Sequence, residues 1–184
     1  MVKLDLGAYC AERRIVTPIN IDFKELHEIL QVAFQWKDSH LHKFNIINEK
    51  GECELKIISE DEEKLESRKD CNTALESEVL IKDYMRDGYR FLYCYDFGDN
   101  WQHEITVEDI IPDYDKNFPI CLEGTGDAPP EDVGGIPGYE EFLEVMGNPK
   151  HVMYDEMKRW ADIQWCRKFD IELLNRRLRY VFRR

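Results

Sequence analysis

The sequence predicts an α+β fold in which helices pack on a largely antiparallel sheet and a helical portion ends the chain. The expected elements run as strands, one helix, further strands and then helices, rather than as repeating strand–helix pairs. A chain of 184 residues with 43% hydrophobic residues can bury one well-packed core. We therefore expect a single domain over residues 1–184, with the helices of about 151–184 packed on it.

The chain begins with two expected strands and a helix. Residues Val2–Leu6 alternate between apolar and polar, and residues 14–17 are rich in β-branched side chains, so both segments are predicted to be strands. Asp22 can cap a helix that ends near Trp36, and Glu25, three residues later, completes a capping box.

The middle of the chain is predicted to add more strands and a short helix. Residues 41–47 and 54–58 are expected to be strands joined by a turn. The charge-rich stretch 60–70 is expected to be an exposed loop or a solvated helical turn. Residues 78–85 are expected to form a short helix.

A β-hairpin is the strongest local prediction. Residues 90–97 and 101–111 carry aromatic and β-branched side chains on either side of Gly98-Asp99-Asn100. The following stretch, 112–136, contains four prolines and four glycines and is expected to be one long irregular loop, a kind of segment that is usually functional or compactly folded on itself.

The register of this hairpin decides the role of His103, and the sequence leaves two alternatives open. With a three-residue loop, Tyr95 faces His103, and the histidine joins an aromatic face with Phe97 and Trp101. With a two-residue turn, Asp96 faces His103 and could orient its tautomer, as a general base or a metal ligand requires.

Helices are expected to fill the last third of the chain. Pro137 suits the first turn of a helix that stops around residues 147–149. Further helices are predicted over about 151–165 and about 171–183, and Asp170 is in position to cap the second of these.

Charge and cysteine usage bound the function. The net charge is −13, yet residues 158–184 hold nine basic and three acidic side chains, so the rest of the chain carries −19. We expect the basic tail to pack on the acidic body or to be solvated, and a nucleic-acid contact is disfavoured by the acidic charge.

The six cysteines are scattered and Asp5 interrupts any signal-peptide core, which indicates a cytoplasmic protein with reduced thiols. No apolar run approaches the roughly 20 residues that cross a bilayer.

Several motifs together resemble one protein family. They are Trp36–Phe44, Tyr95–His103 and Pro129–Tyr139, supported by Leu26–Ile29 and Asn148–His151. In this combination the chain is similar to the plasmid Orf-three-like family, which takes its name from an open reading frame on a root-inducing plasmid.

The resemblance runs from about residue 13 to about residue 178. It implies an α+β domain from a family found mainly in bacteria and archaea, without an established activity. Some relatives carry labels as transposon resolvases, but this chain lacks a Ser or Tyr nucleophile motif supported by arginines. It also departs from the family at residues 9–13, where similar proteins tend to carry Pro-x-Ile-Trp-Arg.

Histidines supply one candidate site. His40 and His42 are two apart, so on a strand both imidazoles would point to one face and could share a metal ion. His103, Asp132 or His151 could provide the remaining ligands. Alternatively, the histidines cap turns and form hydrogen bonds at a sheet edge.

The Pro-Pro-Glu-Asp loop supplies a second candidate. Two prolines stiffen its start, and Gly134-Gly135 allows backbone conformations closed to other residues. Glu131 and Asp132 present carboxylates that could do chemistry, or could accept backbone N–H bonds in a rigid clasp. Cys121 has no evident base beside it and is expected to be a packed residue.

These motifs lead to three functional hypotheses. The first is a protein- or ligand-recognition module whose hairpin, His-x-His strand and Pro-Pro-Glu-Asp loop form one polar cleft. The second is a metal-assisted hydrolase with His40, His42 and His103 as metal ligands and Glu131 or Asp132 as base. The third is a DNA-associated accessory protein of mobile elements that binds through the basic last helix. The candidate cleft residues are His40, His42, Tyr95, Asp96, Asp99, Trp101, His103, Glu131, Asp132 and His151.

Overall fold

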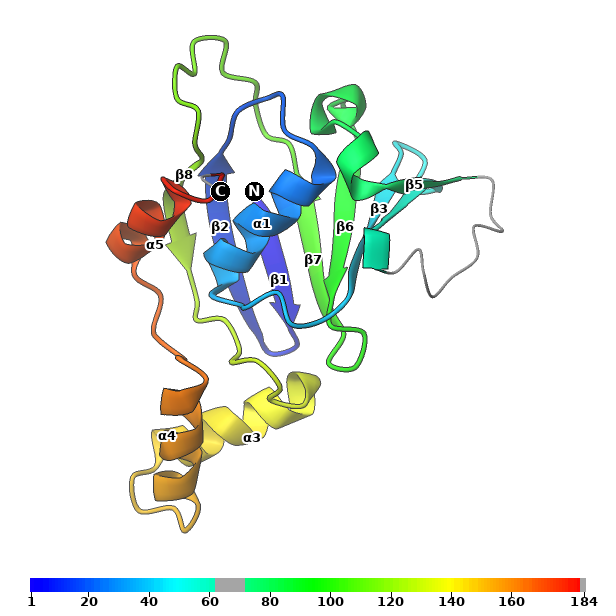
Figure 1. The fold of residues 1–184 in the computed structure, drawn as a ribbon. Helices are drawn as coiled ribbons and strands as arrows, with labels where there is room; N and C mark the ends of the chain where they lie inside the picture. The colour runs from blue at the N-terminus through cyan, green and yellow to red at the C-terminus, as the bar shows by residue number, and fades with distance from the viewer. Residues whose placement is uncertain (62–71, 183–184) are drawn as a thin grey trace.

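A computed structural model describes residues 1–61 and 72–182, and it confirms the α+β fold. One sheet with the strand order β5-β4-β3-β6-β7-β1-β2-β8 forms the body of the protein (Figure 1). All neighbouring strands are antiparallel except β4 and β5, which are parallel. The strands are β1 Val2–Leu6, β2 Tyr9–Val16, β3 His42–Ile47, β4 Cys53–Ile58, β5 Thr73–Leu75, β6 Arg90–Tyr95, β7 Trp101–Thr106 and β8 Ile120–Thr125.

Helices cover one face of the sheet and extend beyond its edge. The first helix, α1, lies across the sheet, whereas α3 and α4 form an arm that projects past its end (Figure 1). The last helix, α5, contacts β8 and α1. The helices are α1 Phe23–Phe34, α3 Gly135–Gly147, α4 Tyr154–Ile163 and α5 Ile171–Leu178, and two 3₁₀ turns are η1 Glu76–Glu78 and η2 Ile81–Tyr84.

The predicted capping box begins α1. Asp22 Oδ1 accepts a hydrogen bond from Glu25 N–H at 2.8 Å, and Glu25 Oε2 accepts one from Asp22 N–H at 3.2 Å. The helix buries an apolar stripe against the sheet and ends at Gln35, whose φ of 63° turns the chain sharply towards Trp36. This turn directs the residues after α1 towards the edge of the sheet where β3 begins.

The structure corrects several boundaries in the first two thirds of the chain. The second strand is longer than predicted because β2 pairs with β1 along its first half. The segment 78–85 forms 3₁₀ turns instead of a helix, and β7 ends at Thr106. Within the stretch predicted to be irregular, residues 120–125 form β8, an edge strand whose second half, Glu123-Gly124-Thr125, lacks apolar side chains. The predicted charged loop 60–70 lies almost wholly outside the described residues.

The structure also corrects the bounds of the C-terminal helices, of which the last two are shorter than predicted. The helix α3 starts at Gly135, before Pro137, whereas α4 starts at Tyr154 and α5 ends at Leu178. Asp170 caps α5 as predicted, since its side chain accepts the N–H of Leu173 at 2.9 Å. The basic side chains Arg176 and Arg177 of α5 are exposed. The helix contacts α1 and β8 through its apolar face and through Asn175, which accepts Cys121 N–H at 2.8 Å and donates to Cys121 O at 2.9 Å.

Neither predicted register of the β6–β7 hairpin is correct. Tyr95 faces Trp101 and Tyr93 faces His103, so the loop spans the five residues 96–100. Asp96 N–H is drawn away from the ladder and donates to Leu41 O at 3.0 Å. His103 therefore lies on the aromatic face, as the three-residue alternative predicted, but it faces Tyr93, two residues before Tyr95 in β6.

No disulfide bond forms among the described cysteines. Cys121 is a packed residue, as predicted. Burial raises the pKa of its thiol, and its Sγ donates a hydrogen bond to Glu123 O at 3.1 Å. In the described part of the chain, no helix has the length and apolar character needed to cross a bilayer.

A buried arginine ties the sheet to the helices. Arg13 on β2 is fully buried, and its guanidinium donates to the carbonyls of Glu12, Ala33, Thr125 and Gly126 at 2.6–3.3 Å. These four acceptors stabilise a charge that burial otherwise penalises, and burial lowers the arginine's pKa to about 10. The arginine thus joins β2, β8 and the end of α1.

Replacing this arginine should be costly. We expect Arg13→Met to lower the free energy of unfolding by about 3 kcal/mol, because four buried carbonyls lose charged donors. Urea denaturation measures this loss. The matched control Arg176→Met removes an exposed cation from α5 and should change stability by less than about 0.5 kcal/mol. Equal stability of the two variants would contradict the assignment.

Candidate functional site

Three segments far apart in the sequence meet at one end of the sheet. They are residues 36–40 after α1, residues 96–100 between β6 and β7, and residues 129–135 leading into α3. Trp36 Nε1 donates to Pro129 O at 3.0 Å and so joins the first segment to the third. The convergence of the hairpin with the Pro-Pro-Glu-Asp loop, predicted from the motifs, is present.

Two glycines allow the hairpin loop and the third segment to touch. Gly134 N–H donates to Asp99 Oδ2 at 3.1 Å. A Cβ at Gly135 would lie 3.1 Å from Asp99 O, and the φ of this glycine is +68°. Both the close approach and the left-handed backbone therefore favour glycine at this position.

The centre of this region is the His40 site, which consists of His40, Asp96, Glu131 and Asp132. From His40 Nε2, the nearest oxygens are Asp132 Oδ1 at 2.9 Å, Asp96 Oδ2 at 3.6 Å and Glu131 Oε2 at 3.7 Å. Although His40 Nε2 is itself buried, it forms no well-aligned hydrogen bond with the described residues. Three carboxylate oxygens thus lie within 3.7 Å of one imidazole nitrogen.

Hydrogen bonds fix the other oxygen of Asp96. Its Oδ1 accepts the N–H groups of Gly98 at 2.9 Å and Asp99 at 3.3 Å, which leaves Oδ2 to face His40. Asp96 is buried at the start of the hairpin loop. The loop backbone therefore orients this carboxylate towards the histidine.

Glu131 is held in the same manner. Its Oε1 accepts Lys37 N–H at 2.7 Å and the Tyr95 hydroxyl at 3.0 Å, which leaves Oε2 on the side of His40. The Tyr95 oxygen also accepts Ser39 N–H at 3.0 Å. Burial and the Glu131 carboxylate raise the pKa of Tyr95 well above its ordinary value, so the phenol keeps the proton that it donates.

Backbone conformation marks these carboxylates as well. Asp96 and Asp132 have φ values of 53° and 58°, in the left-handed region that residues other than glycine rarely adopt. Such conformations cost free energy and persist where the surroundings enforce them, which is common at functional sites. Here they turn two aspartates towards one histidine.

The charge of the His40 site is uncompensated. In the described part of the chain, no lysine or arginine forms an ion pair with Asp96, Glu131 or Asp132. Lys37 lies next to the site in sequence, but its Nζ donates to Gln164 Oε1 at 2.8 Å. The site is therefore anionic and suits a cation.

The donor set fits a divalent metal ion. Ligand atoms of His40, Asp96 and Asp132 all lie within 4.8 Å of one another. Around an ion with bonds of about 2.1 Å, tetrahedral ligand atoms lie about 3.4 Å apart, so small side-chain shifts would suffice. Imidazole and carboxylate ligands suit Zn²⁺, Mn²⁺ or Fe²⁺. Asp132 is exposed, which leaves room for further ligands from solution.

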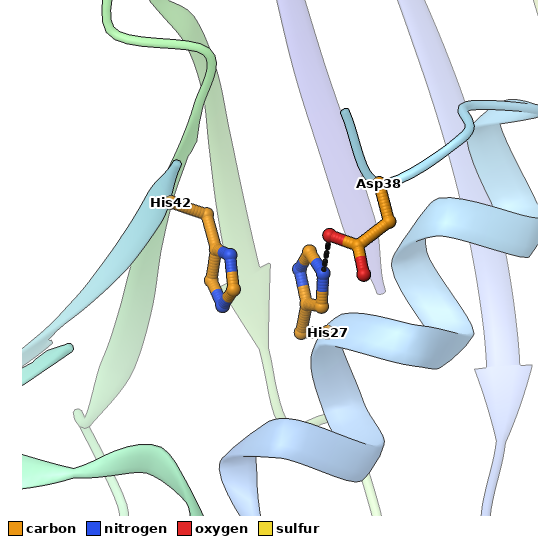
Figure 2. Close-up of side chains that lie close together, drawn as sticks. All are labelled: His27, Asp38 and His42. Atoms are coloured by element: carbon orange, nitrogen blue, oxygen red, sulfur yellow. Dashed lines mark hydrogen bonds and ion pairs between the residues drawn. The ribbon is translucent and has the colours of Figure 1, made fainter. Parts of the chain in front are cut away.

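A second cluster lies deeper, where α1 faces β3 (Figure 2). The rings of His27 and His42 stack with centroids 3.5 Å apart and 5° between their planes. His27 Nδ1 and Nε2 each lie 2.8 Å from a partner, Tyr93 Oη and Asp38 Oδ1 respectively. His42 Nε2 lies 2.7 Å from Glu76 Oε2, and both of these side chains are buried.

The hydrogen-bond directions in this cluster form a closed ring. Gln31 Nε2 donates to Tyr93 Oη at 3.1 Å, so the phenol hydrogen is directed to His27 Nδ1. His27 then donates from Nε2 to Asp38, and Asp38 N–H donates to Gln31 Oε1 at 2.8 Å. Burial lowers the pKa of His27, and the hydrogen bond from His27 lowers the pKa of Asp38.

This ring disfavours a metal ion at His27, Asp38 and His42, whose ligand atoms also lie within 4.8 Å of one another. An ion on His27 Nε2 would move the proton to Nδ1, and the buried Tyr93 hydroxyl would lose its acceptor at a cost of about 1–3 kcal/mol. Two parallel rings also direct their lone pairs along parallel planes, not at one point. The cluster instead fixes the position of Asp38 and therefore of the turn that leads to His40.

The predicted His-x-His ligand pair does not form. His40 precedes β3 and faces the carboxylates, whereas His42 is the first residue of β3 and stacks on His27. The prediction was wrong because it placed both histidines on one extended strand, and the strand begins only at the second. The structure separates them into different clusters.

His103 does not reach the His40 site. It is buried, its Nδ1 lies 3.3 Å from Tyr93 O, and its ring contacts Phe34 and Trp36 edge-on. Trp101 is buried in the core as well. Both residues were predicted to line a cleft, but their side chains fill the space between α1 and the sheet.

His151 also lies elsewhere. Its Nδ1 accepts Met153 N–H at 3.2 Å in the connection between α3 and α4, which is a local turn contact. Conversely, His27, Asp38 and Glu76 of the second cluster were not predicted as site residues. The useful signal was present at His27, a polar residue inside the buried stripe of α1 that requires a polar partner.

Comparisons with known proteins place the chain in a family. The family model described as "Plasmid pRiA4b ORF-3-like protein" matches residues 1–177. The chain belongs to this family. It is 35% identical over 172 residues to the uncharacterised protein y4hQ of Sinorhizobium fredii, covering 93% of this chain and 81% of that protein. The crystal structure of MM3350 from Methanosarcina mazei, a protein of unknown function, matches with a TM-score of 0.77 and 34% identity over 93% of each chain. The pRiA4b ORF-3-like family is thus uncharacterised in function, and no activity is established among these relatives.

The buried imidazole of His103 predicts acid sensitivity. Burial lowers its pKa to about 3, while the unfolded chain takes up the proton near pH 6.5. The unfolded state therefore binds more protons between these values. Stability should fall as the pH falls from 6.5 towards 3, by up to about 1.4 kcal/mol per pH unit from this group.

We expect His103→Leu to remove that part of the pH dependence, because leucine has no proton to bind. Urea denaturation of both proteins at several pH values from 7 to 4 measures it. The difference in unfolding free energy between variant and wild type should shift in favour of the variant as the pH falls. A constant difference would show that His103 does not titrate on unfolding.

Proposed function

We propose that the protein binds a divalent metal ion through His40, Asp96 and Asp132 and uses it to hydrolyse a substrate without phosphate groups. One observation carries the proposal: His40 Nε2 lacks an aligned hydrogen bond and faces three carboxylate oxygens at 2.9–3.7 Å. A buried nitrogen without a partner does not by itself mark a site, because His103 Nε2 also lacks one among the described residues. His40 differs from His103 in facing three carboxylate oxygens.

The arrangement supports hydrolysis through two kinds of group. A bound divalent ion lowers the pKa of a water ligand and polarises a carbonyl oxygen. Glu131 is not among the three mutually close ligands, but its Oε2 lies beside His40. We assign Glu131 as the base that accepts the proton of the attacking water, in agreement with one of the two bases considered from the sequence.

Charge restricts the substrate. Three carboxylates and one divalent ion leave the His40 site anionic, in a chain of net charge −13. Sites that transfer phosphoryl groups surround them with Arg, Lys and metal ions, and the described residues place no free cation here. The proposed substrate is therefore a neutral or cationic amide or ester.

Recognition without turnover is the second candidate. Hydrogen bonds join the loop before α3 to the hairpin loop and to Trp36, so these segments are held together around the His40 site. A polar recognition cleft requires such an arrangement. A bound cation would then coordinate a ligand oxygen without cleaving the molecule. Ion binding with no hydrolysis of any amide or ester would favour this function.

Metal binding is the first testable consequence. After chelator treatment, calorimetric titration with Zn²⁺ or Mn²⁺ should show one saturable site, and the ion should raise the unfolding temperature. His40→Ala and Asp132→Asn should each weaken binding by more than about 100-fold, because each removes a ligand.

Two variants serve as controls for this experiment. His151→Ala removes a histidine outside the His40 site, and Glu141→Gln removes an exposed carboxylate of α3. Both should bind the ion with the affinity of the wild type. The same weakening in all four variants, or the absence of saturable binding in the wild type, would refute the proposed site.

The role of Glu131 is tested separately. Glu131→Gln keeps an oxygen to accept Lys37 N–H and the Tyr95 hydroxyl but cannot accept a proton. We expect kcat for a cleaved amide or ester to fall by about 100-fold or more, with metal affinity changed by less than about threefold. Unchanged kcat would remove Glu131 from the reaction.

A further inference from the structure

A groove of about 560 Å³ lies at the opposite end of the sheet from the His40 site. It includes Ile105 and Thr106 at the end of β7, whereas Trp101 at the start of that strand follows the hairpin loop of the site. Five residues of strand span about 15 Å, so the two regions are separate. In Figure 1, this end of the sheet lies where the segment between β7 and β8 loops beyond it.

The groove opens into the main core. Leu26, Ile29 and Leu30 of α1 and Phe91 of β6 line it, and all four are buried. Its volume is within the range of about 300–1,000 Å³ that is typical of small-molecule sites. The groove thus reaches the margin of the main core, although these four side chains remain buried.

Apolar side chains also surround the mouth. Ile19, Ile110, Ile111 and Leu122 line the groove with 41–54% of their surface exposed. Exposed large apolar residues are ordinary when scattered, but a contiguous set around a cavity indicates a binding site.

Two polar features define the ligand. The hydroxyl oxygen of Thr17 is buried and has no hydrogen-bond partner among the described residues, and Thr17 lines the groove. Arg14, the arginine at its edge, is paired with Glu108 at 2.9 Å and Glu123 at 2.6 Å. The Met1 ammonium lines the groove as well, where it donates to Thr106 O at 2.8 Å and lies 3.9 Å from Glu108 Oε2. Arg14 and the Met1 ammonium are therefore both already paired, and Thr17 supplies the one unsatisfied hydroxyl.

We propose that this groove binds a neutral, elongated apolar molecule that carries a single hydrogen-bonding group, such as a medium-chain alcohol. Its hydrocarbon part replaces water along the α1 and sheet side chains. Its polar group satisfies the Thr17 hydroxyl, which is buried and must turn towards the groove to reach the ligand. A carboxylate at the same place would meet Glu108, and a cation would have to enter an apolar wall, so a neutral ligand is selected. This site is independent of the metal ion and of the proposed hydrolysis.

The test uses the neutral fluorophore N-phenyl-1-naphthylamine and its displacement by 1-decanol. We expect saturable binding of one fluorophore per chain, displaced by decanol at least about tenfold more effectively than by decanoate. Ile110→Asp combined with Ile111→Asp should weaken fluorophore binding by about tenfold or more, because it places charges at the mouth. Thr17→Val should weaken displacement by decanol about fivefold and leave fluorophore binding unchanged.

Two controls separate the outcomes. Val152→Asp places the same charge at an apolar residue that is 91% exposed between α3 and α4, and it should bind the fluorophore as the wild type does. His40→Ala should also bind the fluorophore as the wild type does. The groove is thereby tested separately from the proposed metal site. Non-saturable fluorescence, equal displacement by decanoate, or equal loss in Val152→Asp would each overturn the proposal. A dimer that dissociates in the Ile110→Asp, Ile111→Asp protein would also overturn it, by assigning the groove to a second copy of the chain.

Discussion

The buried carboxylate of Glu131 is the interaction on which the His40 site depends. One of its oxygens accepts Lys37 N–H and the Tyr95 hydroxyl, so a single group joins the turn after α1, the end of β6 and the loop before α3. A carboxylate is suited to this because its two oxygens can serve different neighbours. The second oxygen faces His40, so the same residue both assembles the site and contributes to it.

The surrounding core makes that arrangement rigid. Trp36 stacks on Tyr95 with centroids 4.8 Å apart and donates to Pro129 O, so the segments that carry the site also form its aromatic base. Beneath the turn, the ring of hydrogen bonds through His27 fixes Asp38. Histidines thus have two functions here. His27 and His42 complete the buried network, whereas His40 faces the buried carboxylates of Asp96 and Glu131 and the exposed carboxylate of Asp132.

The local elements could be predicted because their causes are local. The capping box at Asp22 and Glu25 depends on residues three apart, and the hairpin around Gly98 depends on adjacent side chains. The register failed because tertiary contacts decided it: Asp96 bonds to the chain at Leu41, which lengthens the loop to five residues. Edge strand β8 was not predicted for the same reason, because its pairing partner β2 lies far away in the sequence.

The sequence by itself determined the α+β class, the family and the segments that converge. Helix capping, the alternation of apolar and polar residues in strands, and the motifs all depend on residues that are close together in the sequence. Only the tertiary structure decided which histidine faces the carboxylates. His40 and His42 are chemically identical and two residues apart, yet the start of β3 lies between them and sends them to different partners. Burial of His103 and the apolar groove likewise depend on packing across the whole sheet, which no local pattern specifies.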